Sequence, residues 1–151
     1  MANPAMNIRP ARGSDLGTII GLDERHTGLA KPDYWADLFA RYVDAPPPNR
    51  FFLVAERGGG VIGFVVGEIR AWEFGSPPCG WVFAIHVVPG RRERGVGTAL
   101  MDAICERFRA AGANSVRTML LRRDTLDLAF FRSQGMTAGA YIQLEKTLAE
   151  G

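Results

Sequence analysis

Several features are missing or scarce in this chain of 151 residues, and each absence argues against a class of protein. No apolar run reaches the ~18 residues of a membrane-spanning helix, so no membrane partner is expected. The first 12 residues hold no apolar segment of the kind found in signal peptides, which favours a cytoplasmic location. The two cysteines, Cys79 and Cys105, lie far apart without metal-ligand spacing. They predict a reduced protein with no metal site.

Lysine is also scarce, because Lys31 and Lys146 are the only lysines among the 18 basic residues. The formal net charge is +2, so a general nucleic-acid binder is not expected. The arginine excess is typical of GC-rich coding, but the planar arginine fork also recognises phosphate and carboxylate groups. A hydrophobic fraction of 47% and a charged fraction of 23% predict a folded core. At roughly 100–200 residues per domain, residues 1–151 predict a single domain.

Alternating and helical patterns of apolar residues divide the chain into strands and helices. Strands are predicted at residues 7–11, 51–57, 61–72, 81–88, 116–121 and 140–147. Two helices are predicted between the first two strands, a third at residues 96–111 and a fourth around residues 126–131. The strand-helix-strand unit from residue 81 to residue 121 predicts a right-handed parallel crossover. We therefore predict an α/β fold of the mixed α+β kind, a mostly antiparallel sheet flanked by helices in the order β-αα-βββ-α-β-α-β.

The most informative stretch is the loop between the strand at residues 81–88 and the helix that follows it. Gly95 and Gly97 stand at the helix start, and three arginines lie within residues 91–94. A helix N-terminus with arginines beside it suits a pyrophosphate group, although a solvated basic turn has the same composition. A P-loop is excluded because no lysine follows the glycines, and a dinucleotide fingerprint is excluded because Leu100 stands at its third glycine position.

The segment from Arg92 to Gly97 fits the pattern Arg/Gln-x-x-Gly-x-Gly/Ala, which resembles the acyl-CoA pyrophosphate motif of the GNAT superfamily of N-acetyltransferases. Residues 128–136 resemble the second motif of that family, a short helix that ends in Gly-Phe. The order of elements resembles the family over essentially the whole chain. The resemblance implies an enzyme that transfers an acetyl group from acetyl-CoA, its cosubstrate, to a primary amine.

The resemblance also assigns residues to the cosubstrate, which in this family lies between two splayed parallel strands. Backbone groups of Ile85 and Val87 would bind its acetyl and pantetheine parts, as an added strand would. Backbone amides of the loop would hold the pyrophosphate, and they belong to Arg92, Glu93, Arg94, Gly95, Val96, Gly97 and Thr98. The far side would be lined by Asp124, Phe130, Phe131 and Arg132. For Arg132, a surface salt bridge is an equal alternative.

The usual catalytic positions of the family are altered in this chain. Phe131 stands where a tyrosine acid is common, and Trp81 and Phe83 stand where Glu or His often serves as the base. Glu68, an acid within an otherwise apolar strand, is therefore predicted as a base that acts directly or through water. Exposure to solvent or pairing with Arg70 is the competing interpretation.

Two further residues are candidates for proton transfer. Tyr141, on the last predicted strand, is the best remaining phenol for the acid, and a structural hydrogen bond is its alternative. His86 shares a predicted strand with Trp81 and Phe83, and strict alternation places His86 on the opposite face. A packed or hydrogen-bonded histidine is therefore favoured over a catalytic one.

Aromatic and acidic residues near the strand ends indicate the acceptor. Trp72, Glu73 and Trp81 are predicted to bind it, with aromatic walls and a carboxylate for the ammonium group. The expected acceptor is a small amine or amino-acid derivative that attacks the thioester directly in a ternary complex. The alternatives are a peptide or protein acceptor, acetylated at its N-terminus or at lysine, and a non-catalytic acyl-CoA-binding domain. The resemblance further implies a possible homodimer.

Overall fold

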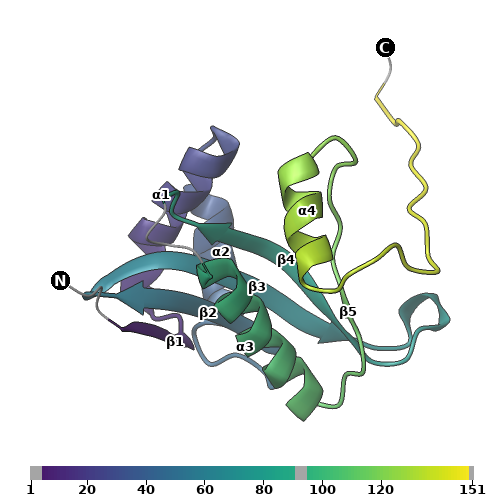
Figure 1. Cartoon of the computed structure of the whole chain (residues 1–151), viewed down its shortest axis with the longest axis horizontal. Helices are drawn as coiled ribbons and strands as arrows, with labels where there is room; N and C mark the ends of the chain where they lie inside the picture. The colour runs from purple at the N-terminus through teal and green to yellow at the C-terminus, as the bar shows by residue number, and fades with distance from the viewer. Residues whose placement is uncertain (1–4, 91–94, 150–151) are drawn as a thin grey trace. The chain divides into compact units, whose positions relative to one another are not determined.

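The computed structural model describes residues 5–90 and 95–149. The chain forms two compact units, residues 1–119 and residues 120–151. The first unit is built on a five-stranded sheet in the order β1-β2-β3-β4-β5 (Figure 1). Its strands are β1 (Met6–Pro10), β2 (Arg50–Arg57), β3 (Gly60–Arg70), β4 (Cys79–Val87) and β5 (Val116–Arg117). The first four strands pair antiparallel and β4 pairs with β5 in parallel, which confirms the predicted mixed, mostly antiparallel sheet.

Helices α1 (Leu16–Thr27) and α2 (Pro32–Tyr42) cover one face of this sheet. Both boundaries follow from the sequence, since Gly28 ends α1 in the left-handed conformation at φ 79° and Pro32 occupies the first turn of α2. The core on this face is aromatic, and the Trp35 ring lies edge-on to Phe64 at 5.4 Å. Apolar burial of this kind provides most of the stabilisation of such a layer.

Helix α3 (Val96–Ala110) covers the opposite face (Figure 1). Glycines in the sheet make room for its large side chains: a Cβ atom on Gly63 would lie 3.2 Å from a Leu100 methyl group, and one on Gly80 would collide with the ring of Phe108. The helix therefore approaches β3 and β4 closely, and this contact holds in place the strand that leads into the loop at residues 88–95.

The second unit contains α4 (Thr125–Ser133), which confirms the helix predicted around residues 126–131. Its N-cap is Asp124, whose side chain accepts a hydrogen bond from the Asp127 amide at 3.2 Å. The strand predicted at residues 140–147 is wrong, because the described residues after α4 form no helix or strand. A strand needs a hydrogen-bonded neighbour, and the sheet pairs none of these residues. Ile142 and Leu144 accordingly remain more than 80% exposed.

Candidate active site

Strands β4 and β5 pair only at their beginnings. Gly80 pairs with Val116 and Trp81 with Arg117, and the ladder then stops, although the Thr118 hydroxyl still donates to the Val82 carbonyl at 3.0 Å. The strand predicted at residues 116–121 is thus only two residues long. Strand β4 continues to Val87 with only β3 beside it among the described residues. Ile85 and Val87, the residues predicted to bind the acetyl and pantetheine parts, lie on this stretch, which has no hydrogen-bonded neighbour on the β5 side among the described residues.

The start of α3 has the geometry expected of an anion site. Gly95 is its N-cap at φ 82°, a conformation that favours glycine. The amide of Ala99 donates to the Gly95 carbonyl at 2.9 Å, so the amides of Val96 and Gly97 have no acceptor within the helix. Thr98 also lies in this first turn. The predicted pyrophosphate ligands Arg92, Glu93 and Arg94 lie outside the described residues.

A β-bulge in β4 corrects the prediction about His86. Val66 pairs with Ala84 and Gly67 with Val82, so Phe83 is an extra residue without an opposite partner. Beyond the bulge His86 pairs with Phe64, and before it Trp81 pairs with Glu68.

Directly paired residues point to the same face of a sheet. Phe64 belongs to the core beneath α1 and α2, and the Glu68 carboxylate accepts a hydrogen bond from Tyr42 of α2. Trp81 and His86 therefore lie on the same face, the one covered by α1 and α2. The prediction that they face opposite sides was wrong because the bulge interrupts the alternation.

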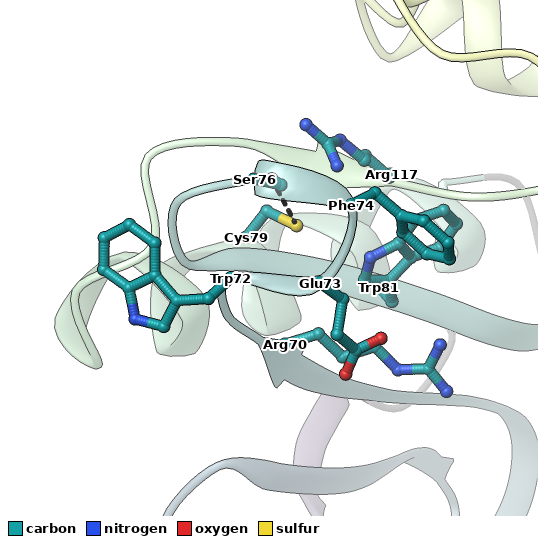
Figure 2. Close-up of a pocket in the computed structure, with 8 residues that line it drawn as sticks. All are labelled: Arg70, Trp72, Glu73, Phe74, Ser76, Cys79, Trp81 and Arg117. Atoms are coloured by element: carbon teal, nitrogen blue, oxygen red, sulfur yellow. Dashed lines mark hydrogen bonds between the residues drawn. The ribbon is translucent and has the colours of Figure 1, made fainter.

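A pocket opens at the point where β4 and β5 are still paired. Its empty space is about 230 Å³ including the open mouth, and its lining residues are Arg70, Trp72, Glu73, Phe74, Ser76, Cys79, Trp81 and Arg117 (Figure 2). The structure thus brings together all three residues predicted to bind the acceptor, Trp72, Glu73 and Trp81. Figure 2 shows the ring of Phe74 near that of Trp81, whereas the indole of Trp72 points away from both.

The loop between β3 and β4 is strained where it forms this pocket. Trp72 and Phe74 have positive φ angles, 69° and 54°, which non-glycine residues rarely adopt. Trp72 and Phe74 are 72% and 83% exposed, so burial in the core does not compensate for the strain. Sequence reasoning missed Phe74, although the Glu-Phe-Gly segment beside Trp72 placed another large apolar residue in a turn.

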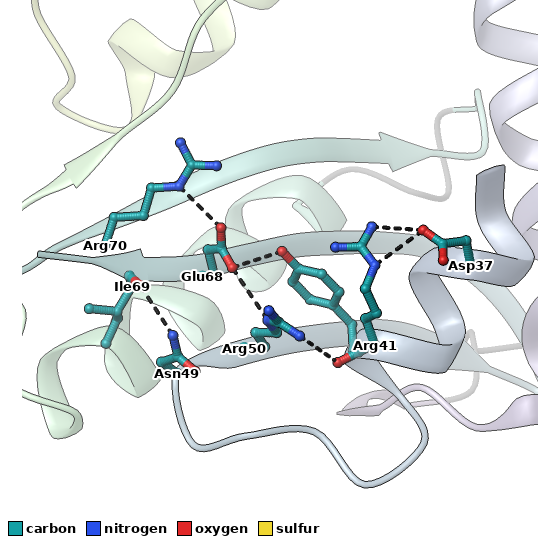
Figure 3. A network of polar contacts seen from close by, with 8 residues as sticks. Asp37, Arg41, Asn49, Arg50, Glu68, Ile69 and Arg70 are labelled. Carbon is teal, nitrogen blue, oxygen red and sulfur yellow. Dashed lines mark hydrogen bonds and ion pairs between the residues drawn. The ribbon is translucent and has the colours of Figure 1, made fainter. Parts of the chain in front are cut away.

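Glu68 lies beside the pocket in a network of polar contacts (Figure 3). Its carboxylate is 15% exposed, with Arg70 Nε at 3.1 Å and Arg50 Nε at 3.5 Å. The Tyr42 hydroxyl donates to it at 2.9 Å. Burial and the Glu68 carboxylate raise the pKa of Tyr42 to about 12. The pairing with Arg70 matches the competing interpretation of Glu68, and its role as a base stays a prediction.

A second polar cluster joins α1, α2 and β4. Asp23 is 2% exposed, and its carboxylate accepts a hydrogen bond from Trp35 Nε1 at 2.9 Å and lies 2.9 Å from Lys31 Nζ. His86 Nε2 lies 3.3 Å from the same carboxylate, and the His26 ring stacks on His86 at 4.3 Å. Burial, and then the neighbouring His26, lower the pKa of His86 to about 4. Sequence reasoning missed Asp23; its signal was its place four residues after the apolar Ile19 on one helix face.

The remaining predicted residues belong to the second unit. Phe131 is buried and its ring contacts Phe130 at 5.2 Å, while Arg132 is exposed in the last turn of α4. Asp124 caps that helix, so its carboxylate already accepts a hydrogen bond. Tyr141 is 50% exposed and lies outside any strand. The roles assigned to these residues stay predictions.

The described parts of the chain show neither a metal-binding cluster nor a membrane-spanning helix. Residues 5–90 and 95–149 contain no cluster of three or more His, Cys, Asp or Glu side chains arranged to hold a metal ion. None of the described helices combines the length and apolar character needed to cross a membrane.

Comparison with known proteins agrees with this geometry. The chain is 31% identical over 90 residues to the L-2,4-diaminobutyric acid acetyltransferase of Nocardia farcinica (strain IFM 10152), an alignment that covers 60% of this chain and 45% of the relative. The chain therefore spans less than half the length of that relative.

Two solved structures share the fold. The aminoglycoside N-acetyltransferase AAC(6')-Iy in complex with CoA has a TM-score of 0.82 at 18% identity, covering 99% of this chain and 98% of that one. The ribosomal-protein-alanine N-acetyltransferase from Brucella melitensis biovar Abortus 2308 has a TM-score of 0.74 at 16% identity, covering 95% and 99%.

The model of the acetyltransferase (GNAT) family matches residues 19–136, which include the loop, α3 and α4. The match spans most of the chain and confirms the resemblance seen in the residues from Arg92 to Gly97 and from 128 to 136. The chain therefore belongs to the acetyltransferase (GNAT) family.

Proposed function

We propose that the protein transfers the acetyl group of acetyl-CoA to the primary amine of a small molecule, by direct attack within a ternary complex. The observation that carries the proposal is that the pocket and the end of the β4–β5 ladder share two residues. The pocket is lined by Trp81 and Arg117, and these two residues are also the last pair of the β4–β5 ladder. An acceptor in the pocket would therefore lie at the inner end of the opening that accommodates the thioester.

The chain's own residues fit acetyl-CoA along that opening. On its β5 side, the stretch of β4 at Ile85 and Val87 can form backbone hydrogen bonds with the amides of the pantetheine arm, as an added strand does. The first turn of α3, from Gly95 to Thr98, directs helix amides toward a pyrophosphate. Arg92, Glu93, Arg94, Asp124, Phe130, Phe131 and Arg132 complete the proposed cosubstrate site.

A small acceptor is favoured by the size of the pocket, about 230 Å³ with its mouth included. That value includes the open mouth, so the enclosed part of the pocket is smaller still. The relative from Nocardia farcinica acts, by its name, on a small diamino acid, which supports the same class. Trp72, Glu73 and Trp81 are the proposed acceptor ligands.

Glu68 is the proposed base and Tyr141 the proposed acid. An ammonium group must lose a proton before it can attack, because the pKa of an ordinary alkyl ammonium is ~10.4. Glu68 lies on the same face as Trp81 and directly opposite it in the β3–β4 ladder, so a water molecule in the pocket could pass the proton to its carboxylate. The departing thiolate is a good leaving group, and Tyr141 is proposed to protonate it.

Acetylation of a protein acceptor is the second candidate function. It is favoured by the fold neighbour from Brucella, which is a ribosomal-protein-alanine N-acetyltransferase by name. An acyl-CoA-binding domain without catalysis is the third, because Trp81, Phe83 and Phe131 replace the usual acid and base of the family. A cytoplasmic location and a homodimer also belong to the proposal, on the sequence and the family alone.

Release of free CoA thiol from acetyl-CoA, measured over a panel of amines and peptides, tests the proposal. Release with small amines and not with peptides is expected. Release with peptides alone would support the protein acceptor, and binding of acetyl-CoA without release on any acceptor would support the binding domain. Glu68→Gln is expected to lower kcat at least tenfold while the Kd for acetyl-CoA stays unchanged. An unchanged kcat across the pH range would refute the base.

A further inference from the structure

We propose that the acceptor carries a carboxylate as well as its amine, so that the pocket between β3, β4 and β5 selects amino acids over simple amines and polycations. This inference rests on the proposed function and narrows its substrate class. It is carried by the charges that the pocket presents, their fixed geometry and their position at the β4–β5 junction.

The positive side of the pocket is held in a defined orientation. Arg70 is anchored at one edge, since its Nε donates to Glu68 at 3.1 Å. Its guanidinium also lies over the Phe83 ring, 5.1 Å from the ring centre. Figure 3 shows the two terminal nitrogens of Arg70 on the side away from Glu68. No described residue forms an ion pair with these terminal nitrogens.

A guanidinium fixed in this way is a preorganised receptor for a carboxylate. Two parallel N–H donors match the two carboxylate oxygens, and the fork loses little entropy when it is already positioned. Arg117, from β5, lines the same pocket and adds a second positive charge. The two arginines thus bring guanidinium groups from β3 and β5 to the same pocket.

The negative side of the pocket is Glu73. Its carboxylate forms no ion pair or hydrogen bond with another residue of the described chain, and it lies near Arg70 in the pocket (Figure 2). An ammonium group can approach Glu73 with the rings of Phe74 and Trp81 beside it, where the negative faces of the rings favour a cation. One anionic and two cationic groups therefore face a single small space.

This charge pattern argues against a polycationic acceptor. Arg70 and Arg117 line the pocket beside Glu73, so each added ammonium group would lie close to a guanidinium group as well as to the carboxylate. A molecule with one carboxylate and one reactive amine satisfies both signs of charge. The aromatic wall tolerates an apolar side chain on the same molecule. An α-amino acid with a free amine is the smallest acceptor that meets all of these requirements.

The experiment compares acceptors that differ only at the carboxylate. Ornithine is assayed beside ornithinamide and putrescine, 2,4-diaminobutyrate beside its carboxamide and 1,3-diaminopropane, and phenylalanine beside phenylalaninamide and phenethylamine. The aminoglycoside kanamycin serves as the polycation. For at least one series, kcat/KM for the carboxylate is expected to exceed that for the amide and the decarboxylated amine at least tenfold, and that for kanamycin by more.

Variants test the residues that make this selection. Arg70→Gln is expected to reduce the ratio of kcat/KM between carboxylate and amide at least fivefold, with the KM for acetyl-CoA unchanged. The ratio cancels any general loss of activity caused by the altered Glu68 pairing. Arg117→Gln is expected to act in the same direction. Arg109→Gln, an exposed arginine in the last turn of α3, is the matched control and should leave the ratio unchanged.

The outcomes separate this inference from the proposed function. Acetylation of amines without preference for the carboxylate would overturn the inference and leave the proposed function intact. A preference that survives both Arg70→Gln and Arg117→Gln would overturn the assignment to this pocket. No thiol release with any acceptor, despite binding of acetyl-CoA, would overturn the proposed function itself.

Discussion

His86 is expected to make the stability of the protein depend on pH between about 6.5 and 4. Burial, and then the neighbouring His26, lower the pKa of His86 from 6.5 to about 4 in the folded chain. In the unfolded chain the histidine regains its ordinary pKa. Within this window the unfolded state binds a proton that the folded state does not bind. The free energy of unfolding therefore falls as the pH drops and is fully present above 6.5.

The size of this effect follows from the displaced pKa. At about 1.4 kcal/mol per pKa unit, a fall from 6.5 to about 4 corresponds to a loss of ~3 kcal/mol on acidification. The ring has little access to water, since the His86 side chain is 14% exposed. Its Nδ1 is buried without a partner among the described residues, so no local acceptor stabilises the protonated ring at that nitrogen.

Urea denaturation at pH 7, 6, 5 and 4.5, for the wild type and for His86→Gln, measures this loss. The glutamine amide can still donate to Asp23 but does not titrate, so the variant should lack most of the decline. His26→Gln identifies the His86 signal in an NMR titration, because the chain has two histidines. It should also weaken the pH dependence, since the neighbouring His26 helps to lower the pKa of His86. A His86 pKa near 6.5, or the same pH slope in wild type and His86→Gln, would refute the reasoning.

Two other substitutions have effects that follow directly from packing and charge. Gly80→Ala places a Cβ atom against the Phe108 ring and is expected to lower the free energy of unfolding by about 1–3 kcal/mol in urea denaturation; unchanged stability would show that α3 can move away from β4. Asp15→Asn weakens one of the two carboxylate partners of Arg9, whose Nη1 lies 2.8 Å from Asp15 and whose Nη2 lies 2.8 Å from Glu56, and should lower the free energy of unfolding by about 1.5–3 kcal/mol at pH 7. The hydrogen bond from Arg9 lowers the pKa of Asp15, so this difference should shrink as the pH falls below the ordinary value of 3.8, and a constant difference would contradict it.

Helix boundaries were the most predictable parts of the molecule, because single residues determine them. Gly28 and Pro32 end α1 and begin α2 as their backbone preferences require. The three residues proposed to bind the acceptor, Trp72, Glu73 and Trp81, were grouped from their positions near strand ends, and all three line one pocket. Arg70 was considered only as a partner of Glu68, and Arg117 was not considered at all. Both long side chains reach the pocket from strands, and sequence spacing does not show where an arginine side chain ends.

The closing strand shows the limit of local patterns. Residues 140–147 alternate in a way that is typical of a strand, but a strand forms only where an open edge offers hydrogen-bond partners. The parallel edge strand β5 has just two residues, and alternation in one segment carries no information about the length of another. The prediction therefore failed because it lacked information on long-range strand pairing, and not because it misjudged the intrinsic propensity of these residues.

The bulge at Phe83 is the feature with the largest consequence that periodicity does not show. With one inserted residue, the side chains that precede it in the strand lie on the opposite face of the sheet from the one that simple alternation would give, when counted from the residues after it. It places Trp81 on the side of α1 and α2 together with His86, and so turns Trp81 toward the same face as Glu68. A bulge also increases strand twist and bends the strand, which fits the end of the β4–β5 ladder just before residue 83. The bulge thus lies between the paired beginning of β4, where the pocket is, and the stretch at Ile85 and Val87 that has no neighbour on the β5 side among the described residues.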